Sequence, residues 1–389
     1  MRNVFVEKEC RKVNICILGG GNIGTLLLAD IGRNDKLHVS LFTSKPNVWN
    51  DIIEVYDSDN VFKYSGKIDR VSDNTDDVIR DADIIISTLP SQIFPVILNK
   101  ISPSIKPGTW IGMMPGSGGG EFYLKKLLGN KCVLFGFQRV HGISRVKEQG
   151  KSVYDLGKKS ELYVAAIPKE LSVEVAATME DIIGIKCYSY GNYLNVTLTP
   201  SNPILHTSRL YSLFRRYNNN CFWDREIEFY SDWTDDASDI LIECDKELQR
   251  MCKMIGNIDL SGVKSLVTYY ESSTPKEMTE KIRSIKAFSG IKAPMIRREK
   301  GYVPDFNSRY FKEDFPYGLC IIKSFCEIVG LNTPMIDEIL MWYEAINGLN
   351  YYIEGKFEGK DLADLLLPQN YGLMCVEDIV EFYDGKTTI

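Results

Sequence analysis

A glycine-rich turn between a strand and a helix constrains the fold of this chain more than any other feature of its sequence. The strand-like run Val13–Leu18 leads into the spacing Gly19-x-Gly21-x-x-Gly24, and helical periodicity continues over residues 23–32. Glycine is needed in such a turn because the chain reverses sharply and its N–H groups approach a pyrophosphate at the helix start. The pattern predicts a dinucleotide site at Gly19, Gly21, Asn22, Ile23 and Gly24, the alternative being a turn that only joins strand to helix.

Short β-branched runs alternate with helical patterns through the first half of the chain, which is typical of a parallel sheet built from βαβ units. The three isoleucines at 84–86 match a strand that is buried on both faces. We predict helices over residues 23–32 and 48–56, and strands over 13–18, 38–43, 84–88, 109–113, 133–137, 162–167 and 186–190.

The pattern changes after about residue 199, where helical periodicity takes over. Thr333-Pro334 followed by Asp337 is a typical helix start, with a capping hydroxyl, a proline in the first turn and an acidic residue. We expect an α/β fold with an N-terminal Rossmann domain, a doubly wound sheet over 1–198, and an all-α substrate and catalytic domain over 199–389. We predict helices over 237–255, 276–288, 317–329 and 334–349, and a loop over 292–308.

The end of the second predicted strand bears on the choice of cofactor. NAD-specific sites usually carry Asp or Glu here, because a carboxylate accepts hydrogen bonds from the ribose hydroxyls and repels a 2′-phosphate. This chain has Thr43, Ser44 and Lys45 instead, with Arg33 upstream as a further cation. The sequence therefore favours NADP over NAD, with Ser44 and Lys45 at the ribose, although Lys45 as an ordinary solvated lysine is the alternative.

Two further segments are expected near the cofactor. Leu89 and Pro90 follow the strand predicted at 84–88, and a strand end at this point of the fold lies beside the dinucleotide. The glycine-rich segment 114–121 follows the next strand. We expect it either to line the nicotinamide pocket or to be a turn without a ligand.

One of the three histidines stands out as a candidate acid–base group. His206 lies in a polar, turn-forming segment, whereas His38 and His141 do not. An imidazole exchanges a proton near neutral pH and is held in one tautomer by a partner carboxylate. By itself, a histidine near a helix start is more often a capping or core residue.

These residues form motifs that resemble those of the opine dehydrogenases, the octopine/nopaline dehydrogenase family. The resemblance covers both domains and implies NAD(P)H-dependent reductive condensation of the amino group of an amino acid with a 2-oxo acid, which gives an opine. Besides the glycine turn it rests on Asn202-Pro203-x-x-His206, on Arg309-Tyr310-x-x-Glu313-Asp314-x-Pro316-Tyr317-Gly318, and on Thr333-Pro334-x-Ile336-Asp337.

The resemblance also implies roles for individual side chains. His206 and Asp314 are the expected catalytic pair, in which Asp314 orients the imidazole and stabilises its cation. Arg309 is expected to hold a substrate carboxylate through paired hydrogen bonds, which lysine cannot supply. Without the resemblance, Arg309 and Asp314 could form an ordinary surface ion pair.

Further substrate contacts are predicted less directly. Asn202 belongs to the histidine motif, while Gln138 and Arg145 flank a predicted strand end close to His141. Arg139 and His141 depart from the apolar turn expected in the family, which leaves the identity of the two substrates open. One aromatic set is a candidate lining of the amine pocket, although such a set is more typical of core packing: Phe222, Trp223, Phe229, Tyr230 and Trp233.

Three alternatives remain at this point. A ketopantoate-reductase-like or β-hydroxyacid-dehydrogenase-like enzyme would reduce a 2-oxo acid without an amine, but such enzymes typically carry a catalytic lysine, and none lies near Asn202–His206. A dinucleotide-binding sensor would need no catalytic pair. A family member with a larger amine substrate would make a metal-chelating opine.

Bulk properties narrow the remaining choices. A net charge of −6 in 389 residues argues against a nucleic-acid partner. The ten cysteines include no Cys-x-x-Cys pair, so we expect reduced thiols and no metal site. No signal peptide and no span-length apolar run is present, which predicts a cytoplasmic protein without a membrane partner. Its expected partners are the amino acid and the 2-oxo acid, together with a second copy in a homodimer.

Overall fold

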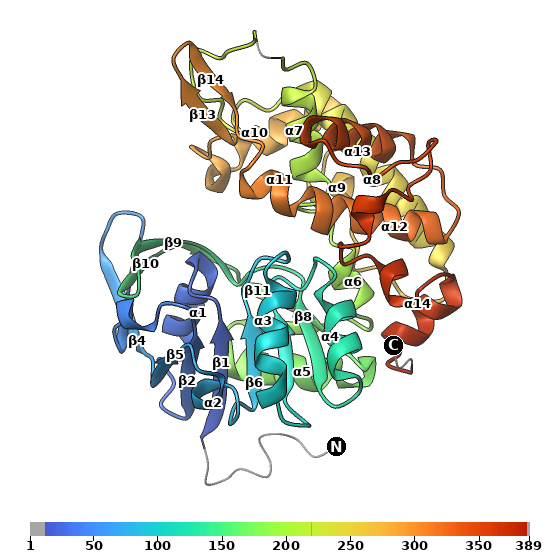
Figure 1. Ribbon diagram of the computed structural model, residues 1–389. Coiled ribbons are helices and arrows are strands. Elements are labelled where there is room, and N and C mark those ends of the chain that lie inside the picture. The colour runs from blue at the N-terminus through green and yellow to red at the C-terminus, as the bar shows by residue number, and fades with distance from the viewer. Residues whose placement is uncertain (1–11, 219, 387–389) are drawn as a thin grey trace. The chain divides into compact units, whose positions relative to one another are not determined.

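The computed structural model describes residues 12–218 and 220–386, which cluster into two compact units (Figure 1). The first unit comprises Met1–Thr197 together with Val380–Ile389, and the second comprises Leu198–Ile379. We had predicted domains of 1–198 and 199–389. The C-terminal segment instead groups with the first unit, because its aromatic side chains pack there: the Phe122 and Phe382 rings lie 5.3 Å apart.

The first unit is built on an eight-stranded sheet with the order β12-β11-β8-β7-β6-β1-β2-β5. The six strands from β5 to β8 are parallel, whereas β11 runs antiparallel to β8. The strand order reverses between β1 and β6, which is where such sheets bind a dinucleotide. The strands are β1 (Val13–Leu18), β2 (Leu37–Phe42), β5 (Arg70–Ser72), β6 (Ile84–Ser87), β7 (Trp110–Met113), β8 (Val133–Phe137), β11 (Glu161–Ile167) and β12 (Lys186–Ser189).

Helices cover both faces of this sheet (Figure 1), as expected for a doubly wound fold. Helices α1 and α5 contact each other, and so do α3 and α4. The core includes Ile15 and Ile17 of β1, which are fully buried together with the apolar residues of α1. The helices are α1 (Asn22–Ile31), α2 (Thr75–Val78), α3 (Phe94–Ile101), α4 (Gly120–Leu128), α5 (Ser172–Ile183), α6 (Leu194–Thr197) and α14 (Val376–Tyr383).

A second sheet, which the sequence did not predict, packs on the outer side of α1. Its order is β4-β3-β10-β9, with β3 (Ile52–Tyr56), β4 (Phe62–Lys67), β9 (Gly142–Glu148) and β10 (Ser152–Lys158). All four strands contact α1, eight of whose ten residues are buried. The helix predicted over 48–56 is therefore wrong: after one 3-10 turn at Pro46–Val48 the chain is extended, and Ile53 and Val55 point inward on every second residue.

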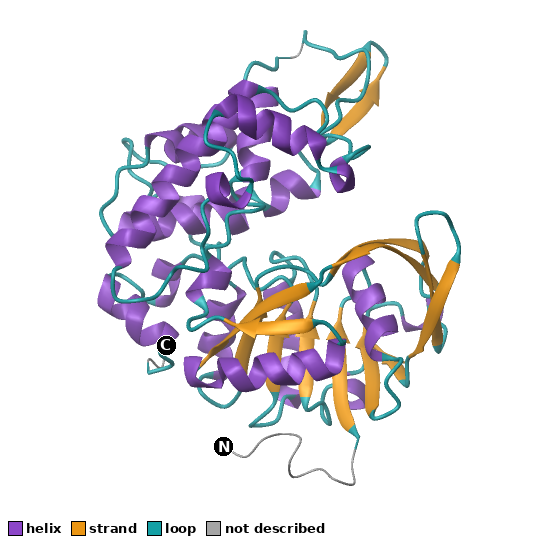
Figure 2. Cartoon of the chain, turned by 180° about the vertical axis from the view of Figure 1, so that it is seen from behind, coloured by secondary structure: helices purple, strands orange, loops and turns teal. Residues whose placement is uncertain are grey.

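The second unit is mainly helical (Figure 2), as predicted. Its longest helix, α8 (Asp235–Ile255), packs against α7 (Leu205–Phe214), α10 (Pro275–Ser284), α12 (Cys320–Ile328) and α13 (Pro334–Asn347). The shorter helices are α9 (Leu266–Tyr269) and α11 (Arg309–Glu313), and a π-helical turn at Phe315–Leu319 joins α11 to α12. No helix in the described part of the chain is long and apolar enough to cross a membrane.

The segment expected to be a loop, 292–308, contains a β-hairpin instead. Strands β13 (Met295–Arg298) and β14 (Gly301–Pro304) pair antiparallel, and Tyr302 forms a further bridge with Trp223. Because the pairing partners of this short, charged segment include a residue about 80 positions away, the local sequence pattern did not reveal them.

Candidate active site

The glycine turn after β1 has the geometry that its spacing predicted. Gly19 has a φ of +101°, which disfavours any other residue, and a side chain there would collide with Leu89 and Thr88. A β-carbon on Gly24 would overlap with the carbonyl oxygen of Gly19, so the helix and strand can approach closely only with glycine. A β-carbon on Gly21 would meet nothing within 4 Å. The outer side of the turn at Gly21 is therefore open.

The start of α1 suits an anionic ligand. Gly21 is its N-cap residue, and no side chain among the described residues caps the helix. The first N–H groups and the positive end of the helix dipole thus remain available for a phosphate. The oxygen of the Asn22 side chain accepts a hydrogen bond of 2.8 Å from the Val146 N–H of β9, which holds this side chain against the second sheet. Asn22 can contribute its backbone N–H and its side-chain NH2 group to such a site, and Ile23 its backbone N–H.

The end of β6 lies beside this turn. The Thr88 hydroxyl donates to the carbonyl oxygens of Leu18, at 3.2 Å, and Gly19, at 3.1 Å. Leu89 packs over Gly19, and the carbonyl of Pro90 accepts the N–H groups that begin α3. The predicted residues that follow β1 and β6 thus come together at one edge of the sheet, where they fit a dinucleotide.

The side chains predicted to favour NADP lie in two different places. Ser44 and Lys45 are exposed directly after β2, and the Lys45 side chain makes no hydrogen bond or ion pair with a described residue. Arg33 lies instead beyond the C-terminal end of α1, about 15 Å from its start for a ten-residue helix. Its guanidinium stacks on Tyr64, 4.5 Å from the ring centre. The suggestion that Arg33 assists Lys45 is therefore wrong.

In the second unit, the structure brings His206 and Asp314 together. His206 is the second residue of α7, and Asp314 follows the last residue of α11. Their Nδ1 and Oδ2 atoms are 2.8 Å apart, and the side chains are 12% and 10% exposed. A carboxylate at this distance holds the proton on Nδ1 and directs Nε2 to the opposite side of the ring.

The two sequence motifs that supply this pair pack directly against each other. A β-carbon on Gly318 would lie 3.1 Å from Cγ of Pro203, so any other residue would crowd the contact between the π-helical turn and the Asn202–His206 segment. The carbonyl of Asn202 accepts the N–H of His206 at 3.1 Å, and the carbonyl of Asp314 accepts the N–H of Leu319 at 2.9 Å. These contacts account for the proline and the glycine that stand near His206 and Asp314 in the two motifs.

The nitrogen of His206 that faces away from Asp314 also has a partner. The Tyr230 hydroxyl lies 2.9 Å from Nε2. The imidazole is further enclosed by the rings of Phe229, at 5.5 Å and perpendicular, and Tyr310, at 4.9 Å. Sequence reasoning had placed Phe229 and Tyr230 in a packing cluster; packing is part of their role, but the hydroxyl of Tyr230 bonds the candidate catalytic group.

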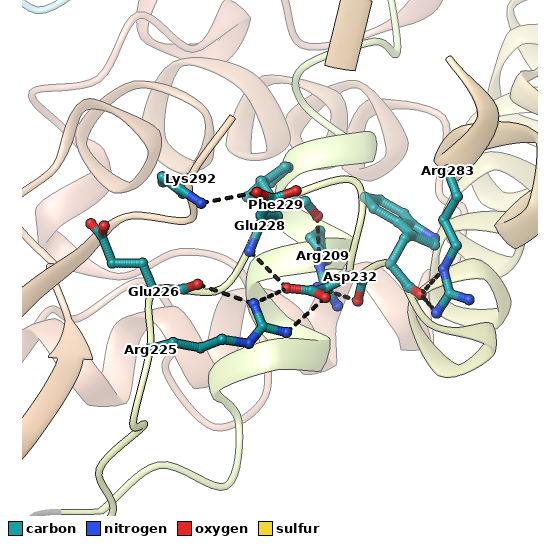
Figure 3. Close-up of polar contacts among 9 residues, drawn as sticks. Arg209, Arg225, Glu226, Glu228, Phe229, Asp232, Arg283 and Lys292 are labelled. Atoms are coloured by element: carbon teal, nitrogen blue, oxygen red, sulfur yellow. Dashed lines mark hydrogen bonds and ion pairs between the residues drawn. The ribbon is translucent and has the colours of Figure 1, made fainter. Parts of the chain in front are cut away.

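The turn that carries Tyr230 is held by a group of charged side chains (Figure 3). Arg209, one helical turn after His206 on α7, donates to the carbonyl oxygens of Phe229 at 3.0 Å and Asp232 at 2.7 Å. Arg283 binds the carbonyl of Trp233 in the same way. On the exposed side, ion pairs join Arg225 with Asp232 and Glu228 with Lys292.

Known proteins share both halves of this arrangement. The family described as NAD/NADP octopine/nopaline dehydrogenase, alpha-helical domain, matches residues 189–347. The N-terminal domain of NAD-dependent glycerol-3-phosphate dehydrogenase matches residues 14–115. Tauropine dehydrogenase of Arabella iricolor is 28% identical over 95% of this chain and 100% of its own length. The helical half of the chain thus matches the octopine/nopaline dehydrogenase family, and the chain resembles an opine dehydrogenase over nearly its whole length.

Further comparisons agree with this assignment. Opine dehydrogenase of Haliotis discus hannai is 26% identical over 95% of this chain and 99% of its own length. Octopine dehydrogenase, solved with NADH and L-arginine and also with pyruvate, has a TM-score of 0.84 at 23% identity and covers 97% of this chain and 99% of its own. The prediction of the family and of a Rossmann-like domain followed by a helical one is confirmed.

These similarities identify the chain as an oxidoreductase that acts on a CH–NH bond with a nicotinamide dinucleotide, as predicted. It is therefore not a non-catalytic sensor. The glycine turn lies in the first unit, and the His206–Asp314 pair lies in the second.

The remaining predicted substrate contacts are more scattered. In the second unit, Arg309 and Asn202 are exposed, and Arg309 makes no hydrogen bond or ion pair with a described residue. In the first unit, Gln138 is half-buried after β8, and Arg145 is exposed on β9, where it donates to the carbonyl of Ser144 at 2.9 Å. Their contact with substrate stays a prediction.

His141 is not an accessible group. It is fully buried, and its Nε2 lies 3.3 Å from Oδ2 of Asp30, which also pairs with Lys158 at 2.6 Å. His141 is therefore not placed to reach a substrate, because the second sheet covers this side of α1. No local sequence pattern predicted that sheet.

The segment 114–121 ends in a buried acid that sequence reasoning missed. Glu121, in the first turn of α4, is fully buried and accepts hydrogen bonds from Thr197 at 2.6 Å and Tyr383 at 3.1 Å. Burial raises the pKa of Glu121 to about 7, against the opposing effect of the Thr197 and Tyr383 hydrogen bonds. Its partners come from distant parts of the chain, so no local pattern reveals them.

Proposed function

We propose that His206 and Asp314 are the acid–base pair with which this opine dehydrogenase condenses an amino acid with a 2-oxo acid and reduces the product. The 2.8 Å contact between Nδ1 and Oδ2 is the observation that carries this proposal. It leaves Nε2 as the atom that gives and takes protons, with Asp314 stabilising the cation without being protonated itself.

The reaction needs protons at two stages. First, the amine nitrogen attacks the keto carbon, and the keto oxygen must be protonated to leave as water. Next, a hydride adds to the imine carbon, and the nitrogen keeps one proton as a secondary amine. The nicotinamide dinucleotide supplies the hydride when bound. His206 can donate a proton to the departing oxygen and accept one from the attacking nitrogen, since an imidazole serves both as a general acid and as a general base.

Arg309 is proposed to bind the carboxylate of the 2-oxo acid. Its guanidinium is exposed and has no partner among the described residues, so it can take a bidentate ligand without losing another contact. It begins α11, five positions before Asp314. Asn202, Gln138 and Arg145 are proposed as further substrate contacts, Asn202 because it starts the motif that ends in His206.

For the cofactor we propose a preference for NADP. The end of β2 presents Ser44 and Lys45 to solvent, where an NAD-specific site would carry an acid. Gly19, Gly21 and Gly24, with the backbone of Asn22 and Ile23, would hold the pyrophosphate, and Leu89 and Pro90 would flank it.

The substrates proposed for the first assay follow from the relatives. Octopine dehydrogenase was solved with L-arginine and with pyruvate. Pyruvate should therefore be tried with a panel of amino acids, and 2-oxoglutarate as the second oxo acid. A secondary amine, identified by mass, should form only when both substrates and NADPH are present. Oxidation of NADPH at the same rate by the oxo acid alone, giving a hydroxy acid, would favour the ketopantoate-reductase-like alternative.

Two broader proposals accompany this function. A cytoplasmic location is supported by the thiols, because the described cysteines are free and most are buried. A homodimer remains a prediction that sedimentation velocity would test.

A further inference from the structure

The imidazole of His206 is bound at both nitrogens. Nδ1 lies 2.8 Å from the carboxylate of Asp314, and Nε2 lies 2.9 Å from the hydroxyl of Tyr230. With a proton held on Nδ1, neutral His206 accepts a hydrogen bond at Nε2 from Tyr230. When the ring becomes cationic, Nε2 turns into a donor and the same hydroxyl must accept.

The two states of this bond differ in strength. A hydrogen bond with an ionised partner is stronger than one between neutral groups. A hydroxyl that serves both states therefore stabilises the cation more than the neutral ring. A cationic Nε2–H buried among aromatic rings without an acceptor would in addition lose its solvation.

We propose that Tyr230 is a positioning residue for the acid–base step, because its hydroxyl holds Nε2 of His206 and supports the cationic form of the ring. This proposal rests on the proposed role of His206 and extends it. Asp314 and Tyr230 would together fix the ring and its tautomer before substrate arrives, and Nε2 would then exchange its proton through the Tyr230 hydroxyl or after substrate displaces it.

The surroundings of Tyr230 keep its hydroxyl in place. Its ring stacks on Phe288, with centres 4.0 Å apart, and lies parallel to Trp233 at 6.2 Å. The residue is 6% exposed. Burial raises the pKa of Tyr230 well above its usual value, so the hydroxyl keeps its proton across the working pH range.

Arg209 fixes the backbone on both sides of Tyr230. It binds the carbonyls of residues 229 and 232, and it is itself 2% exposed. Burial lowers the pKa of Arg209 to about 10, which still leaves it charged at neutral pH. Arg209 and His206 lie three positions apart on α7. One helix therefore carries both the imidazole and the arginine that holds the backbone around Tyr230.

The ionisable groups around the imidazole are few. Asp314 and Tyr310 approach from the α11 side, Tyr230 comes from the turn before α8, and Tyr270 lies near Tyr230. Arg209 is the nearest cation on α7 itself. Of these, only Asp314 and Tyr230 bond the ring nitrogens in the described structure.

A histidine titration tests the proposal independently of any substrate. The chain has three histidines, so a ¹⁵N-histidine NMR spectrum of the whole protein is simple, and His206→Ala identifies the relevant signals. In Tyr230→Phe the pKa of His206 should fall by about one pH unit, since about 1.4 kcal/mol is lost from the cationic state. An unchanged pKa in a folded Tyr230→Phe protein would overturn the proposal.

Two further variants sharpen the result. Tyr352→Phe is the matched control, because it removes a buried hydroxyl that bonds Asp337 at 2.7 Å instead of His206, and it should leave the His206 titration unchanged. Arg209→Lys keeps the charge but cannot bind two carbonyls, so it should lower the pKa in the same direction by less. If Tyr230→Phe does not fold, an Arg209→Lys protein without any shift counts against the proposal.

Activity gives a separate readout. Because reduction consumes a proton, the alkaline limb of the pH profile of kcat/KM should move down with the NMR pKa in Tyr230→Phe. A shift in the NMR titration without opine formation in the wild type would reject the proposed function while leaving the role of Tyr230 intact. If the wild type forms an opine and Tyr230→Phe has the same pH profile, the proposed function stands and the role of Tyr230 is rejected.

Discussion

Tyr383 donates a hydrogen bond of 3.1 Å to the carboxylate of Glu121, which lies 262 positions earlier in the chain. Thr197 donates to the same oxygen, and its hydroxyl lies 3.2 Å from that of Tyr383. Residue 197 is the last of the first unit before the chain enters the second, and residue 380 is where the chain returns. One buried acid therefore joins the two points at which the chain passes between its compact units.

Glu121 predicts a specific pH dependence of stability. Burial raises its pKa from 4.5 to about 7, so between these values the folded protein holds a proton that the unfolded chain has lost. Folding stability should thus fall as pH rises through this range, by on the order of 3 kcal/mol once the pH exceeds 7. Glu121→Gln removes the titration, so its melting temperature relative to wild type should be higher at pH 8 than at pH 5.

The exposed Glu170→Gln variant is the control for this experiment, since it removes the same charge from the surface of the same unit. It should shift the melting temperature equally at both pH values. An equal difference between Glu121→Gln and wild type at pH 5 and pH 8 would show that Glu121 is ionised throughout.

The glycine turn offers a pair of variants that separates binding from folding. Gly21→Ala places a methyl group where nothing lies within 4 Å, so it should cost less than about 1 kcal/mol of stability. The same methyl group stands in the path of a pyrophosphate, and dinucleotide affinity should fall roughly tenfold or more. Fluorescence titration with NADPH measures the affinity, and thermal unfolding measures the stability.

Gly24→Ala should behave differently. Its methyl group would overlap with the carbonyl of Gly19, so the helix must move away from the strand. We expect a loss of at least about 1 kcal/mol in stability together with the loss of binding. If Gly21→Ala bound NADPH as tightly as wild type, the open side of the turn would not be the cofactor site.

Much of the first unit could be predicted because its signals are local. β1 and β8 have the predicted bounds, and the other central strands differ by one or two residues, since their apolar runs are short and bounded by turn residues. The second sheet could not be predicted in this way. Its segment 48–56 places apolar residues at spacings that suit both a helix and a strand, and pairing of β3 with β4 and with β10, about 100 residues later, decides between them.

The candidate site shows the same division. His206, Asp314 and the glycines were found because they belong to motifs of fixed spacing. Tyr230 belongs to no such motif, and an aromatic residue next to another aromatic residue is usually a core residue. Its contact with Nε2 depends on a turn whose shape is fixed by Arg209, and no property of the sequence around Tyr230 encodes that arrangement.

Lys45 predicts the cofactor preference. A lysine near the 2′-phosphate of NADPH contributes a charge-assisted hydrogen bond, so Lys45→Ala should weaken NADPH binding about tenfold. NADH lacks that phosphate, and its affinity should be unchanged. Because the side chain is exposed and has no partner among the described residues, stability should not change. A preference for NADH in the wild type that Lys45→Ala leaves unaltered would contradict the prediction.

The catalytic pair predicts a graded loss of turnover. His206→Ala should lower kcat by about 10²–10⁴-fold, because no other group then exchanges protons at this position. Asp314→Asn should also be severe, since an amide neither favours the cationic ring nor enforces the Nδ1–H tautomer. NADPH affinity should stay close to wild type in both variants. Turnover of His206→Ala near the wild-type rate would remove this residue from the mechanism.

Arg309 provides the sharpest distinction between the two substrates. A guanidinium binds a carboxylate through two parallel hydrogen bonds, whereas the ammonium group of lysine acts as a point charge. Arg309→Lys should therefore raise the KM for the oxo acid about tenfold, equivalent to about 1.4 kcal/mol, and change the KM for the amino acid much less.

The control is Lys312→Arg, which exchanges the same two residue types three positions later on the short helix α11. It should leave both KM values unchanged. Positioning of the oxo acid also contributes to the rate when two substrates must meet, so kcat of Arg309→Lys should fall together with the affinity. Steady-state kinetics with each substrate varied in turn measures all three constants. A larger effect on the KM of the amino acid would move Arg309 to the amine site and leave the carboxylate of the oxo acid to another cation.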